Sequence, residues 1–166
     1  MYAEYLENDR ELRRWNSELY KPFPNTVFAA TTINYGPQTI SEDHVDDKNY
    51  GPGSCAISNV GGFDDTKGGE LFLWNLGLVV RFPAASSAIL LSAVIRHSNL
   101  PIQPEERRYS VVQYSAGALF RFRYNGFRND KKVLEGAKAQ ERAEWRRASH
   151  ERWKTSLVKF RLWKTD

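Results

Sequence analysis

The segment His44-Val45-Asp46 carries an imidazole and a carboxylate two residues apart. Residues at i and i+2 of a strand point to the same face, so His44 and Asp46 would present one nitrogen and one oxygen ligand side by side. A further histidine from a neighbouring strand would complete a two-histidine, one-carboxylate set, which leaves open positions on a ferrous ion. The chain has three histidines, and His97, at the end of a long apolar run, is the natural third ligand. His150 lies among charged residues, where a solvated side chain is expected.

Other reactive residue types near this motif have simpler interpretations. Glu42, Asp43 and Asp47 flank the motif and are more typical of a solvated acidic loop than of metal ligands. Cys55 is the single cysteine, so the chain has no internal disulfide, which fits a reducing compartment. We expect Cys55 to be a small buried hydrophobe rather than a nucleophile.

An arginine follows the third histidine on an alternating segment, 108–114. If this segment is a strand, Arg108, Ser110, Val112 and Tyr114 share one face. A guanidinium fork suits a carboxylate better than lysine does, and the Ser110 hydroxyl would add a donor. Arg107 competes for this role, but alternation lets only one of the two arginines face inward, and the Arg-x-Ser spacing favours Arg108.

The composition is that of one globular domain, spanning residues 1–166. The chain is 41% hydrophobic and contains 9 Phe, 5 Trp and 8 Tyr, which excludes an intrinsically disordered protein. No apolar run approaches the roughly 18 residues that a membrane span needs. The N-terminus lacks the pattern of a signal peptide, so we expect an intracellular protein.

Charge is distributed unevenly along the chain. Residues 128–166 hold 12 Lys and Arg against 6 Asp and Glu, a net charge of +6, whereas residues 1–127 have a net charge of −2. Such asymmetry is compatible with a polyanionic partner. A solvated helix face would produce the same pattern, and the sequence leaves both interpretations open.

The hydrophobic periodicity predicts helices at both ends and strands between them. Residues 4–20 read as a helix with an apolar stripe of Leu12, Trp15 and Leu19. Short runs rich in β-branched and aromatic residues predict strands, with residues 38–46 as a strand or strand-like loop and 118–124 as a candidate extension of the sheet. The expected strands are 26–33, 55–60, 70–74, 78–82, 88–95 and 108–114.

From about residue 130 to 160 the pattern is helical and highly charged. Trp145, Trp153, Leu157 and Phe160 are candidates for one apolar stripe, and Gly136 weakens the first turns. The chain therefore divides into an N-terminal helix (1–24), a β-core (25–128) and a basic helical tail (129–166). Many short strands between helical ends predict a mainly β fold with an antiparallel jelly roll or barrel.

Taken together, the ordered motifs resemble the Tet/JBP family of iron(II)- and 2-oxoglutarate-dependent dioxygenases, in its fungal, transposon-associated branch. The resemblance covers roughly residues 26–130. Besides the motifs above, it rests on Asn34-Tyr35-Gly36-Pro37-Gln38-Thr39, on residues 68–74, on Ile95-Arg96-His97-Ser98-Asn99 and on Asn125-Gly126-Phe127-Arg128.

This resemblance implies a double-stranded β-helix core with iron(II) bound by His44, Asp46 and His97. It implies that 2-oxoglutarate chelates the iron through its C1 carboxylate and keto oxygen. The far carboxylate would pair with Arg108, helped by Ser110. Dioxygen would be the second co-substrate.

The implied activity is oxidation of the methyl group of 5-methylcytosine or thymine in DNA, which further implies a nuclear location. There are two alternatives: a 2-oxoglutarate-dependent hydroxylase of a protein or small molecule, and a non-catalytic β-helix binding module. Tyr35, Gln38 and Tyr114 fit either a pocket lining or core packing, and packing is expected for Trp74. Two departures from the family stand out: the turn Pro83-Ala84-Ala85-Ser86 lacks the usual glycine, and Ser54 replaces an aromatic.

Overall fold

The computed structural model describes residues 1–160, and the chain forms two compact units. One unit is continuous, Tyr20–Gly117, and contains all seven strands of the described chain. The other joins Met1–Leu19 to the described chain after Gly117, and its regular elements are helices.

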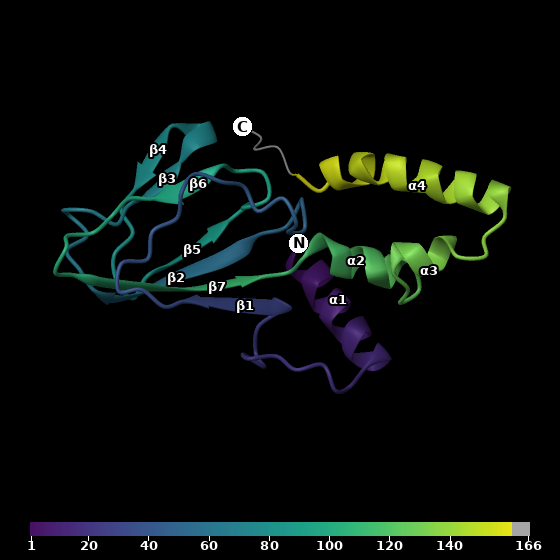
Figure 1. The fold of residues 1–166 in the computed structure, drawn as a ribbon, viewed down its shortest axis with the longest axis horizontal. Helices are drawn as coiled ribbons and strands as arrows, with labels where there is room; N and C mark the ends of the chain where they lie inside the picture. The colour runs from purple at the N-terminus through teal and green to yellow at the C-terminus, as the bar shows by residue number, and fades with distance from the viewer. Residues whose placement is uncertain (161–166) are drawn as a thin grey trace, which may run out of the picture. The chain divides into compact units, whose positions relative to one another are not determined.

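The larger sheet of the β unit has four antiparallel strands in the order β1-β7-β2-β5 (Figure 1). Their bounds are β1 Ala30–Asn34, β2 Cys55–Gly62, β5 Ser87–Leu90 and β7 Arg107–Tyr114. The central strand β7 pairs with β2 over residues 107–113 and with β1 over residues 110–114, so Ser110 and Val112 lie between residues of two neighbouring strands.

The smaller sheet has the antiparallel order β4-β3-β6. Its strands are short: β3 Leu71–Leu73, β4 Leu78–Val80 and β6 His97–Asn99, with a 3₁₀ turn at Trp74–Leu76. All three residues of β6 are buried. The prediction of a mainly antiparallel β fold is confirmed.

The segment from 38 to 49 is a loop that touches both sheets at single bridges. Gln38 pairs with Arg108 of β7, and His44 pairs with His97 of β6. This loop therefore spans from one sheet to the other, which agrees with the expected strand-like loop over 38–46.

The helical unit contains α1 Tyr2–Trp15, α2 Gly117–Tyr124, α3 Asp130–Leu134 and α4 Ala139–Leu157. Aromatic contacts join α1 to α2: Tyr5 meets Phe120 edge-on at 5.4 Å between ring centroids, and Trp15 meets Phe122 at 5.1 Å. Arg123 donates to Glu7 at 2.8 Å and adds an ion pair between the same two helices.

The structure corrects the expected strand over 118–124, which is helix α2. A short apolar run fits either period, and its aromatic residues Phe120 and Phe122 pack on α1. The strand expected over 88–95 is also too long. It ends at Leu90, and the N–H groups of Val94 and Ile95 then bond to the carbonyl of Leu91 in a turn, so His97 begins a strand of its own.

The predicted C-terminal helix is divided in two. Gly136, with φ of +75°, lies between α3 and α4 in a conformation that favours glycine. No residue of α4 is buried, and Trp153 and Leu157 are more than half exposed, so the expected apolar stripe does not form a buried face within this unit. Within the described residues, no helix is both long and apolar enough to cross a membrane.

The turn that lacks a glycine takes up the left-handed conformation without one. Ala85 has φ of +59°, a region that costs an L-residue about 1–2 kcal/mol. The turn is held by main-chain bonds, in which Ala85 N–H donates to Asn59 O at 2.9 Å and Ser86 N–H donates to Pro83 O at 3.3 Å.

Candidate metal and anion site

A cavity of about 1050 Å³ lies in the β unit and is lined by residues of both sheets and of the 38–49 loop. Ile57 and Val112 of the larger sheet contribute apolar walls, and Leu71 contributes from the smaller sheet. Its polar lining includes His44, Asp46, His97, Arg108 and Ser110. The structure therefore brings all five predicted site residues into one cavity.

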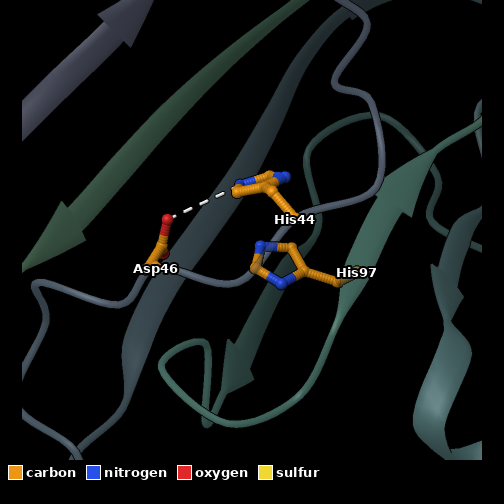
Figure 2. Close-up of side chains that lie close together, drawn as sticks. All are labelled: His44, Asp46 and His97. Carbon is orange, nitrogen blue, oxygen red and sulfur yellow. Dashed lines mark ion pairs between the residues drawn. The ribbon is translucent and has the colours of Figure 1, made fainter.

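His44 and His97 are held together by their backbones. The N–H of His44 donates to His97 O at 3.0 Å, and the N–H of His97 donates to His44 O at 2.9 Å. Their rings lie 4.4 Å apart between centroids. Figure 2 shows the two imidazoles converging with the carboxylate of Asp46. One ligand atom from each residue can be chosen so that all three lie within 4.8 Å of one another.

Backbone carbonyls select the tautomer of both histidines. Nδ1 of His44 lies 2.8 Å from Glu42 O, and Nδ1 of His97 lies 2.9 Å from Ile95 O. A carbonyl oxygen only accepts, so Nδ1 carries the hydrogen and Nε2 keeps its lone pair for a metal. Burial lowers the pKa of His97, which favours this neutral, ligating form.

Asp46 has its two carboxylate oxygens in different environments. Oδ1 lies 3.5 Å from Nε2 of His44, while Oδ2 accepts from the Nδ2 of Asn49 at 3.1 Å. Asn49 also donates to the hydroxyl of Ser92 at 3.1 Å, and Asp46 N–H donates to Ser92 O at 2.9 Å. These contacts orient the carboxylate with Oδ1 toward the histidines.

Arg108 is a buried cation with unused hydrogen-bonding capacity. Its exposure is 3%, and its Nη1 is buried with no hydrogen-bond partner. Cζ lies 6.0 Å from the ring centroid of Phe63 and 5.9 Å from that of Phe82. Burial lowers the pKa of Arg108 to about 10, which leaves it protonated at neutral pH. No ion pair joins Arg108 to a carboxylate among the described residues, so its charge suits an anionic ligand.

Ser110 lies two residues along β7 and also faces the cavity. Its direct cross-strand neighbours are Asn34 of β1 and Asn59 of β2. The Nδ2 of Asn34 donates to Ser110 Oγ at 2.8 Å. A hydroxyl that accepts this bond keeps its own hydrogen to donate to another partner, so Ser110 can serve a carboxylate beside Arg108.

Several other sequence expectations have a clear outcome. Arg107 is exposed while Arg108 is buried, as strand alternation predicts. His150 is exposed on α4, and Cys55 is fully buried, where burial raises the pKa of its thiol. Tyr35 lines the cavity although 81% exposed.

For Gln38 and Tyr114 the sequence was compatible with either a place in the pocket lining or packing in the core. Tyr114 lines the cavity. Gln38 does so too, while its amide Nε2 donates to three carbonyls of the 103–106 loop. Trp74, expected to pack, is 48% exposed and its indole N–H donates to Ser98 Oγ at 3.1 Å, so it is only partly packed.

Three asparagines were missed by the sequence reasoning: Asn34, Asn49 and Asn59. Each hydrogen-bonds a predicted site residue. A signal existed for Asn59, because alternation over the run 55–60 places it on the same face as the apolar Cys55 and Ile57. A polar residue at such an inward position requires a partner. No comparable pattern marks Asn49 in its loop.

No family model and no curated protein matches the sequence. Among solved structures, NgTET1 in complex with 5mC DNA has a TM-score of 0.50 and 16% sequence identity over 63% of this chain. A viral collagen prolyl hydroxylase, vCPH from Paramecium Bursaria Chlorella virus-1, in a 2OG complex, has a TM-score of 0.36 and 12% identity, over 65% of this chain and 69% of that one.

The likeness to NgTET1 concerns the fold. The chain spans about two fifths of the NgTET1 chain that it matches, 41%. The likeness shows a similar fold over the matched part of the chain, while membership of the Tet/JBP family and of its fungal branch stays a prediction. The chain therefore shares the fold of NgTET1 over the matched region.

Proposed function

We propose that this protein is an iron(II)- and 2-oxoglutarate-dependent dioxygenase, built on a double-stranded β-helix core, that oxidises a methylated base in DNA. The observation that carries the proposal is the pairing, in one cavity, of a His-Asp-His group with a buried arginine that has no carboxylate partner among the described residues. The His-Asp-His group alone, or the buried arginine alone, has a simpler structural explanation. Together they provide a metal site for one end of a 2-oxo diacid and a cation for the carboxylate at its other end.

The metal ligands would be His44 and His97 through Nε2 and Asp46 through Oδ1. Their types suit ferrous iron, since two imidazoles and one carboxylate leave positions open for other ligands. When bound, iron(II) and 2-oxoglutarate together supply the oxidation of a substrate C–H bond by dioxygen. The chain itself orients the three side chains: each histidine donates from Nδ1 to the carbonyl of Glu42 or Ile95, and Asp46 accepts from Asn49.

The anionic end of the ligand would be held by Arg108 and Ser110. A buried guanidinium without a counter-ion is costly, and a ligand carboxylate would relieve that cost while accepting from the unsatisfied Nη1. Ser110 Oγ, fixed by Asn34, offers a second donor on the same face of β7. The residues present therefore fit the far carboxylate of 2-oxoglutarate.

Three observations support a nucleic-acid substrate. The cavity volume is at the upper end of the usual range for small-molecule sites, about 300–1,000 Å³, so it has room for a base beside a small diacid. NgTET1, the structural neighbour, is itself in complex with 5mC DNA. Six basic side chains on or beside α3 and α4 are exposed: Lys131, Lys132, Lys138, Arg142, Arg146 and Arg147. A base within a duplex would have to leave the stack to reach the cavity.

The first test is anaerobic addition of 2-oxoglutarate to protein loaded with ferrous iron. A weak visible charge-transfer band is expected, and an Asp46→Ala variant should not show it. The second test is mass spectrometry of DNA that contains 5-methylcytosine or thymine after aerobic incubation. Oxidised base above the Asp46→Ala level supports the proposal, and succinate without oxidised base would favour the protein or small-molecule hydroxylase. Absence of both from iron-loaded, folded protein would favour the binding module.

A DNA substrate also leads us to expect a nuclear location. Fluorescence microscopy of the tagged protein would check this expectation, and exclusion of the protein from the nucleus would count against it.

A further inference from the structure

Asn59 is a fully buried polar side chain beside the proposed anion site, with 0% exposure. Its Oδ1 accepts from Nε of Arg108 at 2.9 Å, and its Nδ2 donates to Phe82 O at 2.9 Å. Both ends of the amide are therefore used, which determines its orientation as well as its position.

The backbone of Asn59 is held equally firmly. Its N–H donates to Ser86 O at 2.9 Å, and its carbonyl accepts from Ala85 N–H at 2.9 Å. The left-handed residue Ala85 allows the chain to turn here, so the segment from Phe82 to Ser86 folds around Asn59. The amide that meets Arg108 is thus anchored through both its side chain and its main chain.

The bond from Nε to Asn59 decides which edge of the guanidinium remains for a ligand. A guanidinium meets a carboxylate in a bidentate manner either through Nε and one terminal nitrogen or through both terminal nitrogens. Asn59 occupies Nε, and the buried Nη1 has no partner. The rings of Phe63 and Phe82 lie about 6 Å from Cζ, at 6.0 and 5.9 Å, and restrict other orientations. The terminal edge is therefore the one presented to a ligand.

We propose that Asn59 is a positioning residue that fixes the terminal edge of the Arg108 guanidinium and thereby sets the chain length of the 2-oxo diacid that the site accepts. This inference rests on the proposed function. A diacid chelated at one end by an ion bound to the three metal ligands, and held at the other end by Arg108, would span a fixed distance. One methylene more or fewer breaks one of the two contacts, unless the guanidinium is free to turn.

The test compares three probes of different length: oxaloacetate, 2-oxoglutarate and 2-oxoadipate. Each is titrated calorimetrically into iron(II)-loaded protein under argon. The wild-type protein should bind 2-oxoglutarate at least about tenfold more tightly than either of the others, in the range that one methylene is worth. Asn59→Ala should weaken 2-oxoglutarate binding by about 10- to 100-fold, the usual effect of losing a hydrogen bond to a charged group.

Selectivity is the readout that separates positioning from a general structural role. In Asn59→Ala the guanidinium is free to turn toward shorter and longer diacids. The affinities for oxaloacetate and 2-oxoadipate should therefore fall less than the affinity for 2-oxoglutarate, and the preference for 2-oxoglutarate should shrink. A fall in affinity by the same factor for all three probes would overturn the inference. Ser58→Ala is the matched control on the opposite face of β2, where the hydroxyl lies 2.7 Å from that of Ser87, and it should leave all three affinities unchanged.

A second variant covers the case in which Asn59→Ala does not fold, as judged by circular dichroism. Asn59→Asp keeps the shape and the acceptor for Nε but places a carboxylate against Arg108. Because the edge of the guanidinium stays fixed, the preference for 2-oxoglutarate over the shorter and longer diacids should persist in Asn59→Asp, although the new ion pair competes with the ligand carboxylate and weakens all three probes. Loss of the length preference in Asn59→Asp would overturn the inference.

Failure of the inference differs from failure of the proposed function. A wild-type protein that binds iron but none of the three diacids contradicts both. A wild-type protein that binds 2-oxoglutarate with no preference for its length, or whose preference survives in Asn59→Ala, contradicts the inference alone.

Discussion

The backbones of His44 and His97 hydrogen-bond to each other in both directions, at 3.0 and 2.9 Å, although the residues are 53 positions apart in the chain. This pairing brings the two imidazole rings to within 4.4 Å of each other between centroids. The loop that carries His44 also carries Asp46, whose N–H donates to Ser92 O at 2.9 Å, so main-chain bonds of this loop bring three candidate ligands together.

We predict that Asp46→Ala abolishes stoichiometric iron(II) binding. Removal of the carboxylate leaves two neutral imidazoles and no charge to offset that of the ion. Anaerobic equilibrium dialysis followed by metal analysis gives the stoichiometry. The control is Asp47→Ala, whose exposed carboxylate lies next in the sequence but outside the His-Asp-His group. Full iron binding by Asp46→Ala would contradict the ligand assignment.

We predict that Asn49→Ala weakens metal binding without abolishing it. Asn49 donates to the Asp46 oxygen that does not face His44, so its removal lets the carboxylate rotate. Removal of such an orienting partner typically reduces metal affinity by about 10- to 100-fold. Calorimetric titration with manganese(II), which is stable in air, measures the effect. Lys48→Ala, at the exposed neighbouring position, should behave like the wild type, and an Asn49→Ala affinity equal to wild type would remove Asn49 from the site.

We predict that Arg108→Ala loses 2-oxoglutarate binding and keeps iron. Breaking a buried charge pair by removing one partner costs about 3–5 kcal/mol, or roughly 10²- to 10³-fold or more in affinity. Arg107→Ala is the natural control because that side chain is exposed on the other face of β7. Titration of iron-loaded protein under argon separates the two variants. A larger effect in Arg107→Ala would move the anion site to that residue.

We predict that Ala85→Gly stabilises the protein. Ala85 occupies the left-handed region at φ of +59°, where glycine has no steric penalty. One more glycine also raises the entropy of the unfolded chain, which offsets part of this stabilisation. The free energy of unfolding should therefore rise by about 1 kcal/mol and Tm by about 2–4 °C. Differential scanning calorimetry measures the shift. Ala84→Gly, at a residue without positive φ, should lower Tm instead, and equal shifts of the same sign in both variants would argue against relief of strain.

We predict that exposed arginines of α4 contribute to DNA binding by pairing with phosphates. Arg146→Gln/Arg147→Gln should weaken binding of duplexes of any sequence, since phosphates carry no base identity. The plot of log affinity against log salt should become shallower by about 0.9 for each arginine–phosphate pair that the substitutions remove. Fluorescence anisotropy at several salt concentrations measures this slope. Arg10→Gln/Arg14→Gln on α1 removes the same charge elsewhere, so an equal effect of both double variants would indicate net charge rather than phosphate binding by α4.

The sequence by itself predicted the candidate ligand types and determined the faces of strand β7. Alternation with period two placed Arg108 and Ser110 inward and Arg107 outward, because side chains of a strand point alternately to its two faces. The same local geometry would have identified Asn59 as an inward polar residue. The charged neighbours of His150 also separated it from the other histidines, and the structure places it exposed on α4.

Only the tertiary structure decided how these parts meet. The segment 118–124 is a helix because its aromatic side chains pack on α1, which outweighs a local pattern compatible with a strand. No hydrophobic periodicity encodes the contacts between the site residues, because they depend on how distant segments and loops fold together. These contacts are the bridge between His44 and His97, the bond from Asn49 to Asp46 and the bond from Arg108 to Asn59. The buried, unsatisfied Nη1 of Arg108 is likewise a property of packing, because a sequence shows that an arginine faces inward but not which of its donors lacks a partner.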